Sequence, residues 1–217
     1  MTQVPQKQEM AVVSKRESIL DAAERLFAEG GYDGVSMRDI AAAANVGLPL
    51  VVYHFKTKLN LYRELFERRK SVLDARQALL RQPLQGDEDA LEHIVRAFVR
   101  PVMSIQHDAA GVAYAKLVAR ESSDPKEAGR GIVEALFDPF AAEFIAAIRK
   151  ALPDITAAAA HWAYHFAVGA LVMSVFDERI ERISAGEVKA MEIEVKANYL
   201  ITFITAGIRA TTAQSCQ

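Results

Sequence analysis

Cysteine, proline and glycine are scarce in this chain. Its one cysteine, Cys216, is the second-last of 217 residues, so disulfide bonds within the chain cannot hold the fold, and we expect a cytoplasmic protein. The seven prolines and eleven glycines fall mostly between segments with helical spacing of apolar residues. The sequence therefore predicts an all-α protein of about nine helices.

Long apolar runs and a strong net charge are also lacking. Charged residues or histidines break every apolar run before the ~18 residues of a membrane span, so we expect no membrane contact. The polar segment 1–13 lacks the apolar core of a secretory signal. A net charge of −2 gives no basic footprint for nucleic acid, yet residues 34–63 carry four Lys+Arg against one Asp+Glu. Near-neutrality therefore does not exclude DNA.

Start and stop signals of short helices fill the N-terminal segment. A first helix is predicted from Ser14, which opens a capping box with Glu17, to the glycines at 30–31. A second helix over 36–44 ends at Asn45, which tolerates left-handed backbone, and a third spans 48–55. Two short helices joined by a turn of about three residues form a helix-turn-helix candidate, although an ordinary helical hairpin has the same spacing.

Several runs of this segment form a specific pattern: Ile19–Ala23, Leu26–Phe27, Gly30–Tyr32, Ser36–Ala41, Val46, Tyr53–Phe55 and Lys58. Over about residues 14–62 the pattern resembles the N-terminal domain of TetR-family transcriptional regulators. The run V-x-x-x-x-V-x-Y-H-F from Val46 also resembles one subgroup of that family. The resemblance implies a flexible arm (1–13), a three-helix DNA-binding domain (14–62), a helical ligand-binding and dimerisation domain (63–210) and a flexible tail (211–217).

The resemblance also implies which residues bind an operator in double-stranded DNA. Ser36 would cap the second helix against a phosphate, Arg38 would reach a base or a phosphate, and Lys58 would hold a phosphate. The recognition helix corresponds to residues 47–55, in which Gly47 stands where Ser or Thr is common. The remaining contacts of this helix are expected from Leu48, Pro49, Leu50, Tyr53 and His54.

Chemistry separates these recognition-helix residues into two groups. Leu48, Pro49 and Leu50 cannot hydrogen-bond a base edge, but they can pack on thymine methyl groups. Tyr53 and His54 are expected to touch phosphate or sugar, as most protein–DNA hydrogen bonds do. Val51 and Phe55 are expected in the core.

Longer amphipathic blocks follow the helix-turn-helix candidate. They predict helices over 59–80, 88–106, 109–122, 126–152, 155–183 and 187–210. Because one recognition helix reads half of a palindrome, we expect a homodimer. The family implies that the last two long helices form its interface, although their apolar faces could instead line the monomer core. These faces carry Trp162, Phe166, Gly169, Ala170, Met173 and Phe176 on one helix and Met191, Tyr199, Leu200, Phe203 and Ile204 on the other.

A pocket for a small-molecule effector is expected among the middle helices, where Pro101 predicts a bend. Arg120 is a candidate anchor for an anionic head group, although a solvated charge or an internal ion pair is the favoured alternative, and His165 is a candidate hydrogen-bonding residue. His161 and His165 lie four residues apart but have no cysteine partner, so we expect no metal and no cofactor. The candidate lining residues are Phe98, Met103, Tyr114, Leu117, Arg120, Phe140, Phe144, Trp162, His165 and Phe166.

These observations predict a ligand-responsive transcriptional regulator, a repressor released from a palindromic operator when a small, largely apolar molecule binds. Two other classes of protein are alternatives to a transcriptional regulator. An all-α enzyme is disfavoured, because the sequence has no nucleophile–base constellation and no phosphate-cradling glycine loop. A protein-interaction module whose first helices do not touch DNA differs in its salt dependence, since phosphate contacts make affinity fall with ionic strength.

Overall fold

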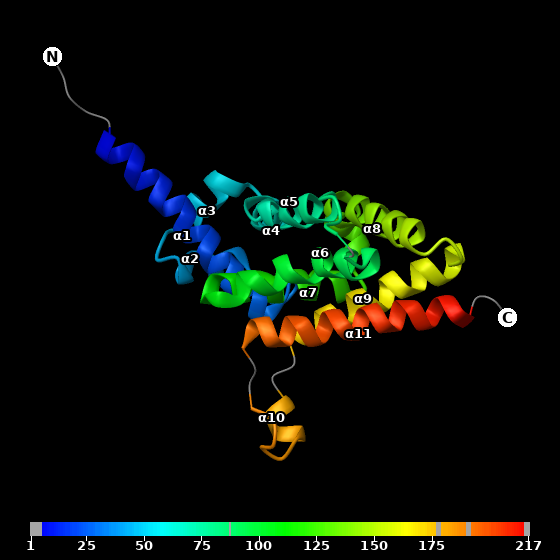
Figure 1. Ribbon diagram of the computed structural model, residues 1–217. Helices are drawn as coiled ribbons and strands as arrows, with labels where there is room; N and C mark the ends of the chain where they lie inside the picture. Colours follow the sequence, from blue (N-terminus) through cyan, green and yellow to red (C-terminus); the bar gives the residue numbers. More distant parts are fainter. Residues whose placement is uncertain (1–5, 87, 177–178, 190–191, 215–217) are drawn as a thin grey trace. The chain divides into compact units, whose positions relative to one another are not determined.

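The computed structural model describes residues 6–86, 88–176, 179–189 and 192–214 (Figure 1). Within these residues the regular elements are helices and none is a strand, which confirms the predicted all-α class. The chain forms two compact units. Unit 1 comprises residues 1–69 and 109–124, and unit 2 comprises residues 70–108 and 125–217. The chain therefore passes between the units at 69–70, 108–109 and 124–125.

Unit 1 combines the N-terminal helices with one helix from the middle of the chain. Its helices are α1 (Gln6–Gly30), α2 (Met37–Ala43), α3 (Leu48–Phe55), α4 (Lys58–Arg68) and α7 (Ala109–Ser123). Helix α1 packs along α7 and against α2 and α4, while α3 packs against α2. The core of unit 1 is formed by Ile19, Ala23, Phe27, Ile40, Ala41, Val51, Phe55, Leu61, Leu65 and Phe66, all of them buried.

Local signals set the ends of the short helices. The first helix stops where predicted, because Gly31 has a left-handed φ of 68° and donates its N–H to the Phe27 carbonyl. Asn45 takes a φ of 51° directly after α2, as its side chain predicts. Thr57 caps α4 by accepting the N–H of Asn60 at 3.1 Å.

The predicted domain limits differ from the observed ones. Helix α1 begins at Gln6, so part of the segment predicted as a flexible arm (1–13) is helical. The boundary predicted at residue 62 falls inside α4, and unit 1 continues to residue 69 and includes α7. Helix α11 continues to Gln214, into the predicted tail (211–217).

The single helix predicted over 59–80 is divided in two. Arg69 ends α4 with φ −105° and ψ 16°, and α5 (Lys70–Leu80) begins unit 2. The guanidinium of Arg69 donates to both carboxylate oxygens of Glu24 at 3.3 Å and lies 5.9 Å from the Tyr114 ring. These contacts hold Arg69 in unit 1, which a periodic apolar pattern along the chain cannot predict.

Unit 2 contains the remaining helices. They are α5, α6 (Ala90–Ser104), η1 (Ile105–His107), η2 (Glu127–Gly129), η3 (Val133–Phe137, a π-helical turn), α8 (Asp138–Ala151), α9 (Ala157–Phe176), α10 (Ile180–Ile183) and α11 (Ile193–Gln214). Helix α6 packs on α5, α8 and α11, and α9 packs on α8 and α11. The block predicted over 126–152 is broken at Gly131, which takes a left-handed φ of 64°, and the π-helical turn η3 leads directly into α8.

The core of unit 2 follows helical spacing on four helices. Pro101 lies inside α6, and the Ser104 hydroxyl donates to its carbonyl at 3.1 Å. The buried core residues are Leu91, Val95, Phe98, Val99 and Met103 on α6, Phe140, Phe144 and Ile148 on α8, Ala160, Ala163, Ala167 and Leu171 on α9, and Ala197, Ile201, Ile204 and Ile208 on α11.

Helix α9 is unusually apolar for a helix of this length. Its segment Ala157–Val175 has a mean hydropathy of 1.2 and is long and apolar enough to cross a membrane. Two histidines, His161 and His165, interrupt the segment, so its apolar residues do not form one continuous run. One side of α9 nevertheless lies in the core of unit 2.

Candidate functional site

The N-terminus of α2 is held by a complete capping box. The Ser36 hydroxyl donates to Asp39 Oδ2 at 2.6 Å and accepts the Asp39 N–H at 3.2 Å, while Asp39 Oδ2 accepts the Ser36 N–H at 2.8 Å. The side-chain and then the backbone hydrogen bond from Ser36 lower the pKa of Asp39 below its ordinary 3.8. Ser36 therefore caps α2 as predicted, while its phosphate contact remains a prediction.

Helix α3 presents an apolar outer surface. Val51 and Phe55 are buried, as predicted, and fix the helix to the core of unit 1. On the outer side, Pro49 is exposed, as are Val52 (43%) and Tyr53 (69%). The sequence analysis did not include Val52 among the DNA-binding candidates. Its position next to Tyr53 in the recognition helix could have indicated that it is exposed.

The other predicted contacts of the recognition helix are less accessible. Gly47 is exposed, but Leu48, Leu50 and His54 are half-buried. The Nε2 atom of His54 is buried and has no hydrogen-bond partner among the described residues, so this nitrogen does not face solvent. A phosphate or sugar contact through His54 would therefore need the other ring nitrogen.

The two lysines near the end of α3 have different environments. The ammonium of Lys58 donates to the Tyr32 and Val35 carbonyls, each at 3.0 Å, and lies 4.3 Å from the Tyr32 ring. Two of its three donors are thus used in holding the turn after α1, so Lys58 has a structural role that the resemblance did not predict. Lys56 is exposed at the C-cap of α3 with a φ of 64°, and it was missed although it adds to the basic count.

The exposed residues of α2 and α3 make one candidate DNA-binding surface. We name it the reading surface and define it as Ser36, Arg38, Gly47, Pro49, Val52, Tyr53 and Lys56. Arg38 is exposed on α2 and pairs with no carboxylate among the described residues. Its guanidinium on α2 and the Lys56 ammonium at the C-cap of α3 supply the positive charge of this surface.

The predicted pocket residues are divided between the two units. Tyr114, Leu117 and Arg120 belong to unit 1. Tyr114 and Leu117 are buried there, with the Tyr114 ring 6.3 Å from that of Phe66. The side chain of Arg120 is exposed, and its guanidinium donates to two backbone carbonyls of α1. Two of the guanidinium donors are thus used within unit 1, and an anionic head group on Arg120 stays a prediction.

Four other predicted pocket residues form part of the core of unit 2. Met103 is buried, and Phe98 contacts Phe140 and Phe144 with ring centroids 6.5 and 5.0 Å apart. Sequence reasoning missed the cation beside them. Arg76 of α5 is only 6% exposed, and its guanidinium lies 4.5 Å from the Phe98 ring and 4.1 Å from the Phe140 ring.

A half-buried tyrosine lies next to the same ring cluster. The Tyr164 ring contacts that of Phe98 at 5.8 Å. Burial raises the pKa of the Tyr164 hydroxyl, while the positive charge of Arg76 opposes the shift and the negative charge of Asp138 adds to it. Unit 2 thus contains two polar side chains, Arg76 and Tyr164, within an aromatic cluster. No sequence motif predicted them.

Three predicted pocket residues lie on the outer side of α9 instead. Trp162 is 59% exposed, Phe166 is 63% exposed, and His165 is exposed beside them. On α11, Tyr199 and Phe203 are 66% and 71% exposed. We name these residues, together with Met173 of α9, the apolar face. The side chain of Phe176 and all of Met191 lie outside the described residues, so their predicted place on it is not tested.

A groove runs along this apolar face between α9 and α11. It has a volume of about 280 Å³. Four of its nine lining residues are alanine or glycine. It is lined by Ala163, Phe166, Ala167, Ala170, Phe203, Ile204, Gly207, Ile208 and Thr211.

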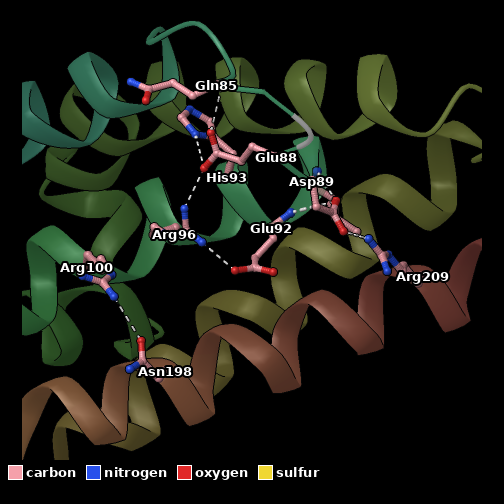
Figure 2. A network of polar contacts seen from close by, with 10 residues as sticks. Gln85, Glu88, Asp89, Glu92, His93, Arg96, Arg100, Asn198 and Arg209 are labelled. Atoms are coloured by element: carbon pink, nitrogen blue, oxygen red, sulfur yellow. Dashed lines mark hydrogen bonds and ion pairs between the residues drawn. The ribbon is translucent and has the colours of Figure 1, made fainter.

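A polar network ties the start of α6 to α11 (Figure 2). Asp89 caps α6 by accepting the Leu91 N–H at 2.9 Å and also pairs with Arg209 of α11. About three turns further along α6, Arg100 donates to Asn198 of α11 at 3.1 Å. These contacts fix the position of α11, and with it the apolar face, within unit 2.

The same network holds His93 of α6. Its Nε2 donates to the Leu79 carbonyl at 2.9 Å, and its Nδ1 lies 3.3 Å from Glu88 Oε1 (Figure 2). Glu88 also accepts a hydrogen bond from Arg96 at 2.6 Å. The backbone N–H of Gln85, and then His93 and Arg96, lower the pKa of the Glu88 carboxyl.

A second groove lies next to His93. It has a volume of about 560 Å³ and lies between the end of α5, the start of α6 and the end of α8. Its surface is mostly apolar, with Arg81 and Lys150 as cations. Arg81 pairs with Glu143 at 2.7 Å, while Lys150 is exposed. The groove is lined by Leu80, Arg81, Gln82, Pro83, Leu84, Ala90, His93, Ile94, Ala147, Lys150 and Ala151.

Two family models match this chain. The model described as "Bacterial regulatory proteins, tetR family" matches residues 19–65. The model described as "Tetracyclin repressor-like, C-terminal domain" matches residues 96–207, more than half of the chain.

Curated relatives match the N-terminal part. The biofilm operon icaADBC HTH-type negative transcriptional regulator IcaR of Staphylococcus aureus is 39% identical over 49 residues, which are 23% of this chain and 26% of that protein. The HTH-type transcriptional regulator AcrR of Shigella flexneri is 32% identical over 89 residues, which are 39% of this chain and 41% of that protein. The chain thus spans between a quarter and two fifths of these relatives.

Solved structures share the fold over nearly the whole chain. AibR in complex with isovaleryl coenzyme A and operator DNA gives a TM-score of 0.63 at 16% identity, covering 87% of this chain and 97% of that one. A TetR-like transcriptional regulator from Rhodococcus sp. RHA1 gives 0.61 at 18% identity, covering 95% and 99%. The helix-turn-helix of unit 1 and the two family matches lead to one conclusion. The chain belongs to the TetR family of bacterial regulatory proteins.

Proposed function

We propose that the protein is a ligand-responsive DNA-binding regulator that represses transcription from a palindromic operator and acts in the bacterial cytoplasm. The observation that carries the proposal is the reading surface, where a capped α2 and a core-anchored α3 present Arg38 and Lys56 beside an apolar outer side. Two relatives add support. IcaR is named a negative transcriptional regulator, and the AibR structure contains operator DNA.

The chemistry of the reading surface sets how it would read DNA. Arg38 and Lys56 supply phosphate contacts, or in the case of Arg38 a bidentate contact to guanine. Pro49 and Val52 have no side-chain donor or acceptor, so they pack on thymine methyl groups. The half-site is therefore expected to contain thymine where the outer side of α3 meets the major groove.

Replacing Arg38 with alanine tests the reading surface. We expect operator affinity to fall by about 1–3 kcal/mol and the salt dependence to weaken by about one phosphate contact if the arginine binds phosphate. Affinity is measured by fluorescence anisotropy at several salt concentrations, on a duplex that the protein selects from a random pool.

Lys58→Met is the matched comparison for Arg38→Ala. Because the Lys58 ammonium holds the Tyr32 and Val35 carbonyls, its loss should lower the melting temperature of the protein. The salt dependence of DNA binding should change less in this variant than in Arg38→Ala. The reading surface is contradicted if Arg38→Ala binds the selected duplex with unchanged affinity and salt slope.

A second copy of the chain is the proposed partner of the apolar face. Exposed aromatic residues on α9 and α11 form an apolar patch larger than scattered surface residues would give. Pairing of this face about a twofold axis would bury it and join two reading surfaces, as a palindrome requires.

The proposed effector is a small molecule with an apolar chain and an anionic group. The groove beside His93 has the size of a ligand site, a mostly apolar lining and the cations Arg81 and Lys150. AibR was solved with isovaleryl coenzyme A, a ligand that combines an apolar acyl group with phosphates. An effector that binds best to the conformer unable to span the operator lowers DNA affinity, and DNA lowers effector affinity by the same factor.

Reversing the charge of Lys150 tests the groove. Lys150→Glu should weaken the binding of isovaleryl coenzyme A, used as the probe, by about tenfold, because a favourable charge interaction becomes a repulsive one. Binding is measured by isothermal titration calorimetry. Arg149→Glu is the control, since this neighbouring exposed cation of α8 does not line the groove. Equal effects of the two substitutions would contradict the assignment.

A further inference from the structure

Helix α7 has an unusual place in the chain. It belongs to the DNA-binding unit, yet the segments before and after it, residues 70–108 and 125–217, belong to unit 2. Both ends of α7 are therefore joined to unit 2 through the peptide chain. How a change of conformation in unit 2 is passed to the DNA-binding helices therefore depends on the residues that fasten α7 to them.

Arg120 fastens α7 to the end of α1. Its Nε donates to the Ala28 carbonyl at 2.6 Å, and its Nη2 donates to the Glu29 carbonyl at 2.9 Å. Both carbonyls lie in the last turn of α1, where backbone acceptors lack partners in the helix and carry its partial negative charge. The planar fork of a guanidinium satisfies two such acceptors at once.

Glu121, the next residue, fastens α7 to α4. Its carboxylate is 1% exposed and accepts the Tyr62 hydroxyl at 3.0 Å. The Tyr62 ring in turn contacts Phe27 of α1 at 4.8 Å and Tyr32 at 4.9 Å. Adjacent residues of one helix, which point about 100° apart, thus reach two different helices of unit 1.

The two contacts lead directly to the helix-turn-helix. The end of α1 is followed by the turn that carries Tyr32 and Val35, whose carbonyls hold Lys58 at the start of α4. Ser36, the cap of α2, comes next in the chain. A displacement of the last turn of α1 therefore moves the anchors of both α2 and α4.

We propose that Arg120 and Glu121 are the coupling residues of this protein, which transmit the state of unit 2 to the reading surface and the state of the reading surface to unit 2. The proposal rests on the DNA-binding function proposed above. It assigns to Arg120 a role different from effector binding, and to the Tyr62–Glu121 hydrogen bond a role beyond core stability.

Hydrogen exchange on the full chain, with and without the selected duplex, tests the coupling without an effector. In the wild-type protein, DNA should slow amide exchange in α7 and in the following segment, residues 125–151, by about tenfold, because unit 2 responds to what is bound at unit 1. In Arg120→Met, DNA affinity should stay within about threefold, while the DNA-dependent change in 125–151 should largely disappear.

Two further variants make the result decisive. Arg25→Met is the matched control, since Arg25 is an exposed arginine of α1 whose Nε donates to a carbonyl of its own helix at 3.4 Å; it should keep the wild-type response. Tyr62→Phe keeps the ring and removes the hydroxyl, so it should reduce the response even if Arg120→Met does not fold. The proposal is overturned if Arg120→Met or Tyr62→Phe binds DNA and keeps the full response in 125–151. Failure of the wild-type protein to bind any duplex would instead overturn the proposed function.

Discussion

Phe203→Asp is expected to convert the proposed dimer to monomers. Phe203 is 71% exposed on the apolar face and lines its groove, and a carboxylate there would be buried without a partner when two copies pair. We expect dimerisation to weaken by about 3 kcal/mol or more, which is more than a hundredfold. Sedimentation equilibrium measures this change directly.

Operator binding should fail together with the dimer. When two reading surfaces are linked, the second binds as an intramolecular step, and loss of the link costs about 10²–10⁴ in affinity for a palindrome. Binding to a single half-site should stay unchanged. Leu84→Asp is the control, since it adds the same charge at an exposed apolar residue of unit 2 outside the face. A Phe203→Asp protein that remains dimeric at wild-type affinity would refute the proposed interface.

Phe98→Ala should give the largest loss of stability among the residues predicted to line a pocket. Phe98 is 2% exposed and contacts the rings of Phe140, Phe144 and Tyr164 and the guanidinium of Arg76. Truncating such a side chain removes its transfer energy and leaves a cavity, which costs about 3–5 kcal/mol. Urea unfolding of the full chain measures the difference.

A ligand-lining role for Phe98 would give a different result. In that case the free energy of unfolding would change by less than about 1 kcal/mol, and effector affinity would carry the loss. Leu84→Ala provides the reference, because Leu84 is 47% exposed in the same unit and its truncation should be nearly neutral for stability.

The helix-turn-helix was predictable because its signals are local. The Ser36–Asp39 spacing, the left-handed residue at 45 and the apolar positions Val51 and Phe55 each act within a few residues, and each has its expected structure. The family resemblance rests on local runs that include Ser36–Asp39 and Phe55, which is why fold and family could be predicted from the sequence.

The predicted pocket could not be found in the same way. An apolar residue on an amphipathic helix fits a core, a pocket or an interface equally well, and Phe98, Tyr114 and Trp162 turn out to differ in this respect. Contacts between distant segments were equally invisible. Nothing near Arg120 in the sequence indicates a bond to residues 28 and 29, and nothing near Lys58 indicates one to residue 32.

The threefold passage of the chain between the units limits how this regulator can be taken apart or recombined. A fragment that ends at residue 69 contains α1 to α4 but lacks α7, so Phe66, Tyr62 and the last turn of α1 lose their partners. A DNA-binding head grafted from this chain onto another sensor must therefore carry residues 109–124 as well. Recombination at a single junction replaces only one side of the interface between α7 and the N-terminal helices. Exchange of both segments, 1–69 and 109–124, preserves that interface.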